Sequence, residues 1–538
     1  MHRLFLPLAL AVAFGLAAWL RLDQLASQVL IEDEWHPVHQ VIYLSPLRIL
    51  TSFGNADYGI PLVLLYFLQA RLVGLSELGL RLPMVAAGLA TVAFLPLMLR
   101  RRLDDRVLAT FALLLALSPF LVSYSRIARS YAITLVGIYA AFWCLERATR
   151  EGAFAWRHAW RYSVLSGLVV WTHAVTGPML VAPLAALWWG AMRGRGPAWR
   201  TLVALTALTA ACMGLAVVPP LFGDLQALAG KSGIDQIKPE TIVGAWYLWV
   251  GTGSSVIALT SLALAVVGFA AVWRASPVAR WIVLGALFTV AVLVMTKPWW
   301  VDRSLALGRY LLPALPVVLL AISAGLIASA DAATGFIATQ RRVHPAWALA
   351  VVAIAVLAWW PQSPHGELLQ RPNSYTQHSF FQYDYRVEKN PIRIGQLTYP
   401  ASGFWATLAS SPPGSLTIAV APFQYATWEW PAPLWERASG QRVIPAYLWG
   451  TCEARRYGEV PPDGRFHFDN AVYVANGWPL AARPVHYLAF YRGPARKGMS
   501  PPLPQCEAWM RLRFGQPFHE DEALVVWKNP SPVPAAPD

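Results

Sequence analysis

Charged residues are scarce in this 538-residue chain. Asp, Glu, Lys and Arg make up 13% of it, and 56% of the residues are hydrophobic. An average soluble domain has about 25% charged residues. The composition therefore excludes an ordinary soluble enzyme, a disordered chain and a collagen, and long apolar stretches between Leu4 and Trp360 indicate a protein that lies in a lipid bilayer.

Cysteine is also rare, with four residues and no CxxC or zinc-ligand spacing. A disulfide-rich scaffold and a structural zinc site are therefore not indicated. Cys144 and Cys212 fall in predicted spans, where they would pack as small apolar residues. Cys452 and Cys506 lie in the C-terminal tail, where an oxidising compartment would allow them to pair. The sequence leaves that disulfide open.

The chain has an excess of cations, with a formal net charge of +14. Such a charge can indicate nucleic-acid binding, but here the arginines cluster at alternate gaps between apolar stretches. The clusters lie at residues 3, 100–106, 147–161, 193–200, 274–280 and 341–342. This is the pattern of the positive-inside rule, which places these gaps on the cytoplasmic side of a membrane. We expect no nucleic-acid partner.

The predicted fold class is an α-helical polytopic membrane protein with a C-terminal extracytoplasmic α/β or α+β domain. We expect eleven spans, with an uncleaved signal anchor as the first. They are 4–20, 80–99, 107–122, 131–145, 162–172, 176–192, 202–221, 255–273, 281–296, 310–328 and 347–360. The N-terminus would then be cytoplasmic and the C-terminus periplasmic, in a multi-pass protein of the bacterial inner membrane.

Two domains follow from this division. Residues 1–360 form the membrane domain, including a large first outer loop at 21–79. Residues 361–538 form the C-terminal periplasmic domain, in which β-like runs occur at 416–422, 485–491 and 523–529.

The segment from Ile31 to Gln40, in the first outer loop, is the most informative. It contains the consecutive carboxylates Glu32, Asp33 and Glu34, followed by His36 and His39. These residue types can accept protons or hold a metal ion at the outer face of the membrane. The alternative is a solvated acidic loop without a catalytic role.

The same loop continues to Asp57 and Tyr58, which precede a predicted surface helix. The stretch from Ile60 to Val73 is apolar and could lie along the membrane surface rather than cross it.

Arginines also occur at the predicted outer turn from Tyr124 to Ala132. Arg126 and Arg129 are not explained by the positive-inside rule, and a charge beside apolar helices needs a partner because its burial in the membrane costs about 2.5 kcal/mol or more. They could bind a phosphate through their planar guanidinium groups, or form a structural ion pair with the acidic first loop.

A third group of cations lies at a further outer turn and includes Lys297, Arg303 and Arg309, beside Tyr310. Three cations at one apolar boundary are more than packing requires. His173, at another outer turn, is either a satisfied polar residue or a metal ligand. Carboxylates and cations thus converge on the outer face of the bundle, where they would suit an anionic lipid with an apolar tail.

These residues resemble the GT-C superfamily of integral-membrane glycosyltransferases, in the branch of protein O-mannosyltransferases, the lipid A aminoarabinose transferase and the rhizobial core galacturonosyltransferases. The resemblance covers about residues 1–330. It rests on four features, which are Asp33-Glu34 in the first loop, LRLP at 80–83, SRIARSYA at 125–132 and GRYLLPALP at 308–316.

The resemblance implies an inverting transfer of a sugar from a polyprenyl-phosphate donor to a periplasmic lipid, glycan or protein acceptor. It implies that Asp33 is the catalytic base, with Glu34 and Glu32 as neighbours. His36 and Asp57 are further candidates for lining the cavity.

For the donor, the resemblance implies phosphate contacts from Arg129 and Arg309, with Tyr131 and Tyr310 lining the cavity. Arg126 and Lys297 are further candidates for binding the phosphate. The sequence establishes no cofactor; a divalent cation is an open possibility, for which Glu32 and His173 are candidate ligands. The alternatives are a secondary transporter and a lipid-linked oligosaccharide ligase.

Overall fold

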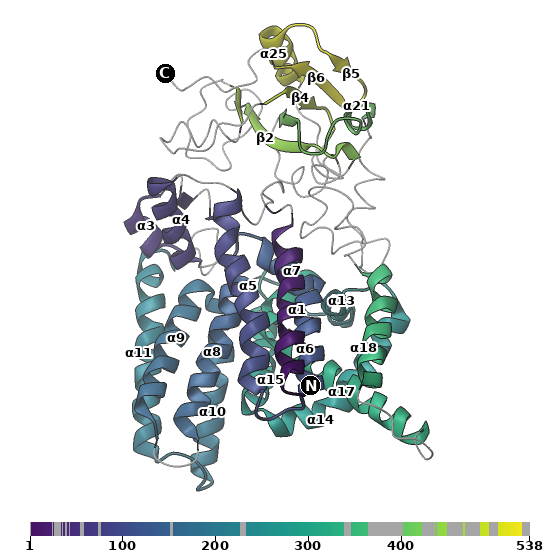
Figure 1. Ribbon diagram of the computed structural model, residues 1–538. Coiled ribbons are helices and arrows are strands. Elements are labelled where there is room, and N and C mark those ends of the chain that lie inside the picture. Colours follow the sequence, from purple (N-terminus) through teal and green to yellow (C-terminus); the bar gives the residue numbers. More distant parts are fainter. Residues whose placement is uncertain are drawn as a thin grey trace. The chain divides into compact units, whose positions relative to one another are not determined.

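The computed structural model divides into two compact units (Figure 1). Unit 1 comprises residues 1–23, 47–62 and 83–363, and unit 2 comprises residues 24–46, 63–82 and 364–538. The structure describes residues 2–23, 25, 34, 36–37, 40–41, 44–53, 59–73, 77–150, 154–225, 233–337, 346–363, 402–421, 435, 438–448, 466–468, 485–493 and 504–529. The division into domains at 360/361 remains a prediction.

Unit 1 is helical. Its first helices are α1 (His2–Leu22), α3 (Pro46–Thr51), α6 (Asp105–Leu117), α7 (Pro119–Arg126), α8 (Tyr131–Thr149), α9 (Trp156–Thr172), η1 (Ala174–Thr176), α10 (Gly177–Met192) and α11 (Trp199–Gly223). They are followed by α13 (Pro239–Val250), α14 (Ser255–Ala275), α15 (Pro277–Thr296), α16 (Ser304–Tyr310), η2 (Leu312–Ala314), α17 (Leu315–Ile337), α18 (Ala346–Trp359) and η3 (Trp360–Gln362). Three helices have residues in both units, namely α3, α4 (Ile60–Leu72) and α5 (Glu77–Leu99).

The eleven predicted spans all fall on helices. Within the described residues, seven helices are long and apolar enough to cross a membrane, and an eighth candidate is the bent pair α6 and α7. The other three predicted spans correspond to α8, α9 and α18, of which α9 has 17 residues and α18 has 14. A straight crossing needs about 20 residues. The chain is a polytopic helical membrane protein, as its composition predicts.

The predicted span 107–122 is not one continuous helix, because it breaks between Leu117 and Pro119. The axes of α6 and α7 differ by 51°. Proline has no N–H to continue the helix, and its fixed φ suits the first position of a new one. The Ser118 side chain then caps α7 by accepting a hydrogen bond from the Leu121 N–H at 3.5 Å. Ser118-Pro119 is thus a local signal for the break.

Close helix pairs form the interior of unit 1. Helix α1 packs on α6, α9 packs on both α8 and α11, and α14 packs on α17. At the last of these contacts, a Cβ on Gly268 would lie 2.5 Å from the Gly325 backbone nitrogen, so only glycine permits this approach. Small residues commonly allow membrane helices to pack this closely.

Unit 2 contains a six-stranded mixed sheet in the order β3-β2-β1-β4-β6-β5. The strands are β1 (Thr417–Ala421), β2 (Arg442–Leu448), β3 (Phe466–Phe468), β4 (Tyr487–Tyr491), β5 (His519–Glu520) and β6 (Leu524–Lys528), with helices α21 (Gly403–Leu408) and α25 (Pro504–Phe514). Strand β1 is parallel to β2 and β4, whereas β6 is antiparallel to β4. The three predicted β-like runs are confirmed as β1, β4 and β6, which are neighbours in the sheet.

The sheet has an apolar core in which Leu488, Val525 and Trp527 pack with Met510 of α25. Cys506, also in this core, is disulfide-bonded, whereas Cys144 and Cys212 are free. Cys452, the partner considered from the sequence, lies outside the described residues. A disulfide in this part of the chain suits an oxidising compartment.

Candidate functional site

The turn between α7 and α8 presents the two arginines of the SRIARSYA motif. Helix α7 ends at Arg126, Ile127 is extended, and α8 begins at Tyr131 after Ser130. The Ser130 hydroxyl donates to the Thr172 carbonyl at 2.9 Å, which ties this turn to the end of α9. The end of α9 also carries His173, so that two turns far apart in sequence lie together.

Aromatic side chains from three turns surround Tyr131. The ring of Tyr131 lies 4.9 Å from that of Tyr124 and 5.2 Å from that of His173, measured between centroids. The His173 ring lies 6.3 Å from the ring of Tyr310, which ends α16. Tyr124, Tyr131 and His173 are buried, and Tyr310 is half-buried. The structure thus brings together three of the predicted residues and adds Tyr124.

Two predicted phosphate ligands reach the same ring. The guanidinium carbons of Arg129 and Arg309 each lie 5.9 Å from the Tyr131 ring centroid, and that of Arg309 lies 5.6 Å from the Tyr310 ring. These separations are within the range of cation–π attraction, which holds a guanidinium without consuming its N–H donors. We call Arg129, Arg309 and the four rings of Tyr124, Tyr131, His173 and Tyr310 the Tyr131 cluster.

Lys297 lies at the C-cap of α15, in the turn before α16. Its backbone is left-handed, with a φ of 45°, and its carbonyl accepts a hydrogen bond from the Gly233 N–H at 3.0 Å. Trp300, three residues later, is also left-handed at φ 71°. Non-glycine residues in this region are strained. Leu293 and Val301 flank the turn and belong to the apolar group on which Tyr310 rests.

Arg126 is buried and faces the end of α1. Its Nη1 atom donates to the Leu20 carbonyl at 2.8 Å, and its Nη2 atom donates to the Asp23 carbonyl at 2.7 Å. These two acceptors are backbone carbonyls. The ion pair with the acidic first loop considered from the sequence stays a prediction, because Glu32 and Asp33 lie outside the described residues. The expected binding of phosphate by Arg126 is not tested by this geometry.

In unit 2, Glu34 forms a buried bidentate ion pair with Arg81. Nε of Arg81 donates to Oε1 at 2.8 Å, Nη2 donates to Oε2 at 2.7 Å, and Nη1 donates to the Leu25 carbonyl at 2.9 Å. Both Glu34 oxygens therefore accept charge-assisted bonds. Arg81 belongs to the LRLP segment, whose arginine sequence reasoning did not single out. The feature of the sequence that could have indicated Arg81 is a cation inside an apolar stretch, as for Arg126.

Of the other predicted residues of the first loop, the structure describes one. His36 is described and half-buried, whereas Glu32, Asp33, His39 and Asp57 lie outside the described residues. Across the described part of the chain, no group of three His, Cys, Asp or Glu residues could hold a metal ion. A divalent-cation site therefore stays a prediction.

No family model matches the chain, and no curated protein matches it. Solved structures similar to the chain include ArnT from Cupriavidus metallidurans bound to undecaprenyl phosphate, with 13% identity, a TM-score of 0.46, and coverage of 98% of this chain and 97% of that one. Archaeal oligosaccharyltransferase AglB from Archaeoglobus fulgidus, in complex with an inhibitory peptide and a dolichol-phosphate, has 11% identity, a TM-score of 0.45 and coverage of 98% and 88%.

A third similar structure is the mycobacterial arabinofuranosyltransferase AftD, with 16% identity, a TM-score of 0.44, and coverage of 98% of this chain and 42% of that one. Because all three TM-scores lie below 0.5, function is inferred from the chain's own residues.

Proposed function

We propose that this protein is an inverting glycosyltransferase that moves a sugar from a polyprenyl-phosphate donor to a lipid, glycan or protein acceptor on the periplasmic side of the bacterial inner membrane. The observation that supports it most directly is the convergence of Arg129 and Arg309 on Tyr131, each at 5.9 Å, at one end of apolar helices. A phosphate with a long apolar tail matches both the cations and the surrounding helices.

Arg129 and Arg309 are assigned to the donor phosphate. Arg129 is buried and Arg309 half-buried, so their charges act in a medium less polarisable than water. A guanidinium presents several N–H donors in a plane, which suits the oxygens of a phosphate. Tyr131 and Tyr310 hold these guanidinium groups by ring contacts and would line the path of the sugar.

Asp33 is assigned as the base. Its neighbour Glu34 accepts two bonds from Arg81 and is therefore better suited to anchoring this segment than to taking a proton. In the transfer, the Asp33 carboxylate takes the proton of an acceptor hydroxyl, whose oxygen forms a bond to the anomeric carbon. The bond from that carbon to the phosphate oxygen breaks, and the polyprenyl monophosphate leaves with both electrons of the bond.

The two arginines would act mainly in the transition state. Negative charge grows on the leaving phosphate as its bond to the sugar lengthens, and fixed cations stabilise that charge more than they stabilise the ground state. Inversion follows because a single displacement occurs on the face opposite the phosphate.

The deciding experiment is sugar transfer by the purified protein in nanodiscs, with a panel of radiolabelled polyprenyl-monophosphate sugars and membrane extract as the acceptor source. We expect label to move with the wild type and the Asp33→Asn variant to lose at least about a hundredfold in rate, since general-base catalysis contributes about 10² to 10⁴. Full transfer by folded Asp33→Asn would reject the assignment of the base.

A matched binding measurement tests the cations. Arg129→Gln should weaken binding of undecaprenyl phosphate about tenfold or more, because a hydrogen bond to a charged group is strong. Arg200→Gln is the control, since Arg200 stacks on Trp199 at 5.7 Å and is exposed. If wild-type protein consumes no monophosphate-linked sugar but exchanges a solute in proteoliposomes, it is a transporter. If it consumes only diphosphate-linked glycans, it is a ligase.

A further inference from the structure

Two buried arginines outside the Tyr131 cluster bond to each other's helices. Arg21, in the last turn of α1, has a side chain that contacts α6 and α7, whereas Arg126, at the end of α7, contacts the end of α1. Both are at most 4% exposed. In apolar helices such burial is costly unless the guanidinium donors are used.

Arg21 caps the end of α6. Its Nη2 atom donates to the Leu115 carbonyl at 3.3 Å, and its Nη1 atom donates to the Ala116 carbonyl at 3.1 Å. In a continuous helix the Leu115 carbonyl would accept from residue 119, but Pro119 has no N–H. The helix break thus frees an acceptor, and Arg21 occupies it. The cation also lies at the negative end of the α6 dipole.

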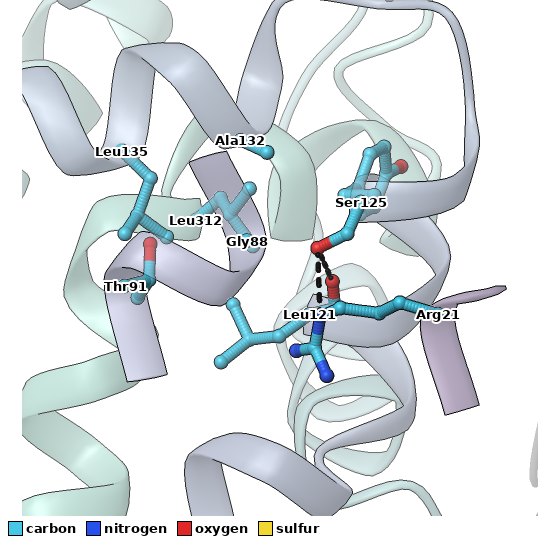
Figure 2. A pocket seen from close by; sticks show the side chains of 9 residues that line it. Arg21, Gly88, Thr91, Leu121, Ser125, Ala132, Leu135 and Leu312 are labelled. Carbon is cyan, nitrogen blue, oxygen red and sulfur yellow. Dashed lines mark hydrogen bonds between the residues drawn. The ribbon is translucent and has the colours of Figure 1, made fainter. Parts of the chain in front are cut away.

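Arg21 also reaches α7, as Figure 2 shows. Its Nε atom donates to the Ser125 hydroxyl at 3.3 Å, and that hydroxyl donates to the Leu121 carbonyl at 2.6 Å. Gly88 of α5 lies against this contact: a Cβ there would come within 2.7 Å of the Ser125 Cβ and 3.1 Å of the Arg21 Nε. Four helices therefore meet around one guanidinium.

Arg126 caps the end of α1 in the same way. Its two Nη atoms donate to the carbonyls of Leu20 and Asp23, which belong to the last turn of α1 and the residue after it. These are among the carbonyls that a helix end leaves without an intrahelical donor. Arg21 of α1 thus caps α6, and Arg126 of α7 caps α1, so the two arginines tie the end of α1 to both sides of the helix break.

We propose that Arg21 and Arg126 are positioning residues that lock the end of α1 to the α6–α7 break, and that Arg126 does not bind the donor phosphate. The chain leaves α1 at Asp23, ten residues before Asp33, and leaves α7 at Arg126, three residues before Arg129. The lock fixes the starting points of the two segments that carry the base and a phosphate ligand. This consequence rests on the proposed function, but the lock itself does not.

Hydrogen–deuterium exchange of the full chain in nanodiscs tests the lock without any donor. Arg126→Gln should accelerate exchange in the last turn of α1 about tenfold or more, because a cap bond to a charged group is lost. Arg21→Gln should accelerate the same turn, although Arg21 donates to α6. Arg200→Gln, at an exposed site, should leave it unchanged. Unaltered exchange in Arg126→Gln and Arg21→Gln would overturn the lock.

Two further variants test the lock if Arg126→Gln or Arg21→Gln does not fold. Arg126→Lys keeps the charge but has a single nitrogen, so it should restore only part of the protection. Gly88→Ala keeps both arginines and should loosen the same turn by displacing Ser125 and the Arg21 guanidinium. Protection equal to wild type in both variants would contradict the lock.

Binding of undecaprenyl phosphate separates positioning from phosphate binding. We expect Arg126→Gln to bind this probe within about twofold of wild type, and Arg129→Gln to bind it about tenfold or more weakly. Equal weakening in the two variants would make Arg126 a phosphate ligand and overturn its exclusion from the donor site. If the wild type does not bind the probe, the proposed function fails, while the exchange experiment still decides the lock.

Discussion

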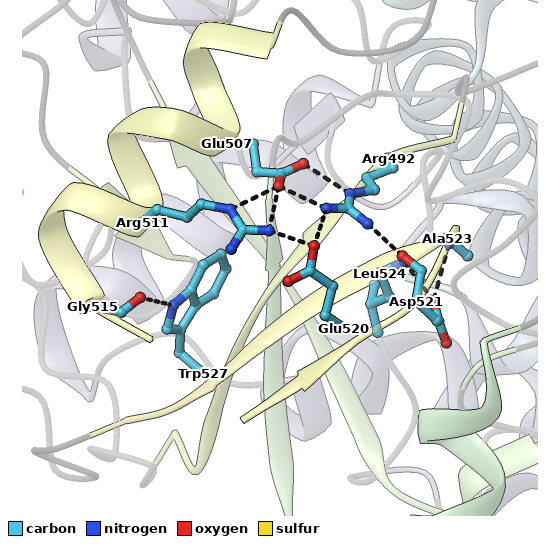
Figure 3. A network of polar contacts seen from close by, with 9 residues as sticks. All are labelled: Arg492, Glu507, Arg511, Gly515, Glu520, Asp521, Ala523, Leu524 and Trp527. Atoms are coloured by element: carbon cyan, nitrogen blue, oxygen red, sulfur yellow. Dashed lines mark hydrogen bonds and ion pairs between the residues drawn. The ribbon is translucent and has the colours of Figure 1, made fainter. Parts of the chain in front are cut away.

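Arginine is used differently in the helical unit and in the sheet of unit 2. In unit 1, Arg21 and Arg126 are almost fully buried and donate to backbone carbonyls at helix ends. In the sheet domain, Arg492 and Arg511 are partly exposed and share the carboxylates of Glu507 and Glu520 (Figure 3). One residue type thus serves as a cap in one region and as a member of an ion network in the other.

The difference follows from the solvent around each group. In an apolar bundle an unpaired guanidinium cannot be hydrated, so each donor needs a fixed acceptor, and broken helices supply carbonyls. In the sheet network, Nη2 of Arg492 lies 2.7 Å from Glu507 Oε1 and 2.6 Å from Glu520 Oε1, but water reaches all members. Water weakens such pairs, which contribute about 1 kcal/mol or less each.

The largest effect should come from breaking the buried pair of Glu34 and Arg81. Glu34→Gln leaves the Arg81 guanidinium buried without its carboxylate, which should lower stability by about 3–5 kcal/mol. Thermal unfolding of the detergent-solubilised protein measures this. The double variant Glu34→Met with Arg81→Met should lose less, because no charge stays buried. A loss below about 1 kcal/mol in Glu34→Gln would remove the contrast between buried and exposed arginines.

A smaller effect should come from acidification of the sheet network. The Arg492 guanidinium, which bonds to Glu507, lowers the pKa of that carboxyl below its ordinary value of 4.5, and the pKa of Glu520 is lowered for the same reason. Carboxyls with a depressed pKa stabilise the fold above their ordinary pKa, and this stability disappears as pH falls through the folded value.

Exchange at β6 should therefore accelerate below about pH 4.5 in the full chain. Arg492→Met should be less stable at neutral pH and should show a flatter pH profile. Lys528→Met is the matched control, because Lys528 lies over the Phe518 ring at 4.5 Å and is exposed. Equal profiles for Arg492→Met and the wild type would show that the network contributes nothing to acid stability.

The smallest effect should come from the exposed clamp between α6 and α17. Arg106 donates to the two carboxylate oxygens of Asp331 at 2.8 and 3.1 Å, but its side chain is 26% exposed and that of Asp331 47% exposed. Asp331→Asn should change stability by about 0.5 kcal/mol or less. Thermal unfolding decides this, and a loss as large as that of Glu34→Gln would mean that exposure does not govern these pairs.

Local signals in the sequence account for much of the fold. All eleven apolar runs between arginine clusters fall on helices, and seven of these helices, or eight with the bent pair, are long and apolar enough to cross a membrane among the described residues. Helix α13 was not predicted. The apolar runs of β1, β4 and β6 were predicted, since they are buried on the sheet. Strands β2, β3 and β5 were missed. Two of these have three residues or fewer, which is too short for a pattern.

The partners of individual side chains were harder to predict. The position of Arg126 and Arg129 beside apolar helices indicated that they need partners. It did not show that Arg126 donates to carbonyls at the end of α1 while Arg129 lies near Tyr131. Arg81 and Arg21 were not singled out at all, although each follows the rule applied to Arg126. A helix end more than 90 residues away supplies the acceptors of Arg21, and no sequence spacing reveals that distance.

By itself, the sequence determined that this protein lies in a membrane, that its long apolar segments are helical, and that cations gather at particular turns. These properties follow from hydrophobicity and charge along the chain, which act over neighbouring residues. Only the tertiary structure decided that Arg129 and Arg309 share the Tyr131 ring, that Arg21 caps α6 and that Arg126 caps α1. Such contacts depend on how the chain returns to itself, because each guanidinium bonds to the acceptor that packing brings within about 3 Å.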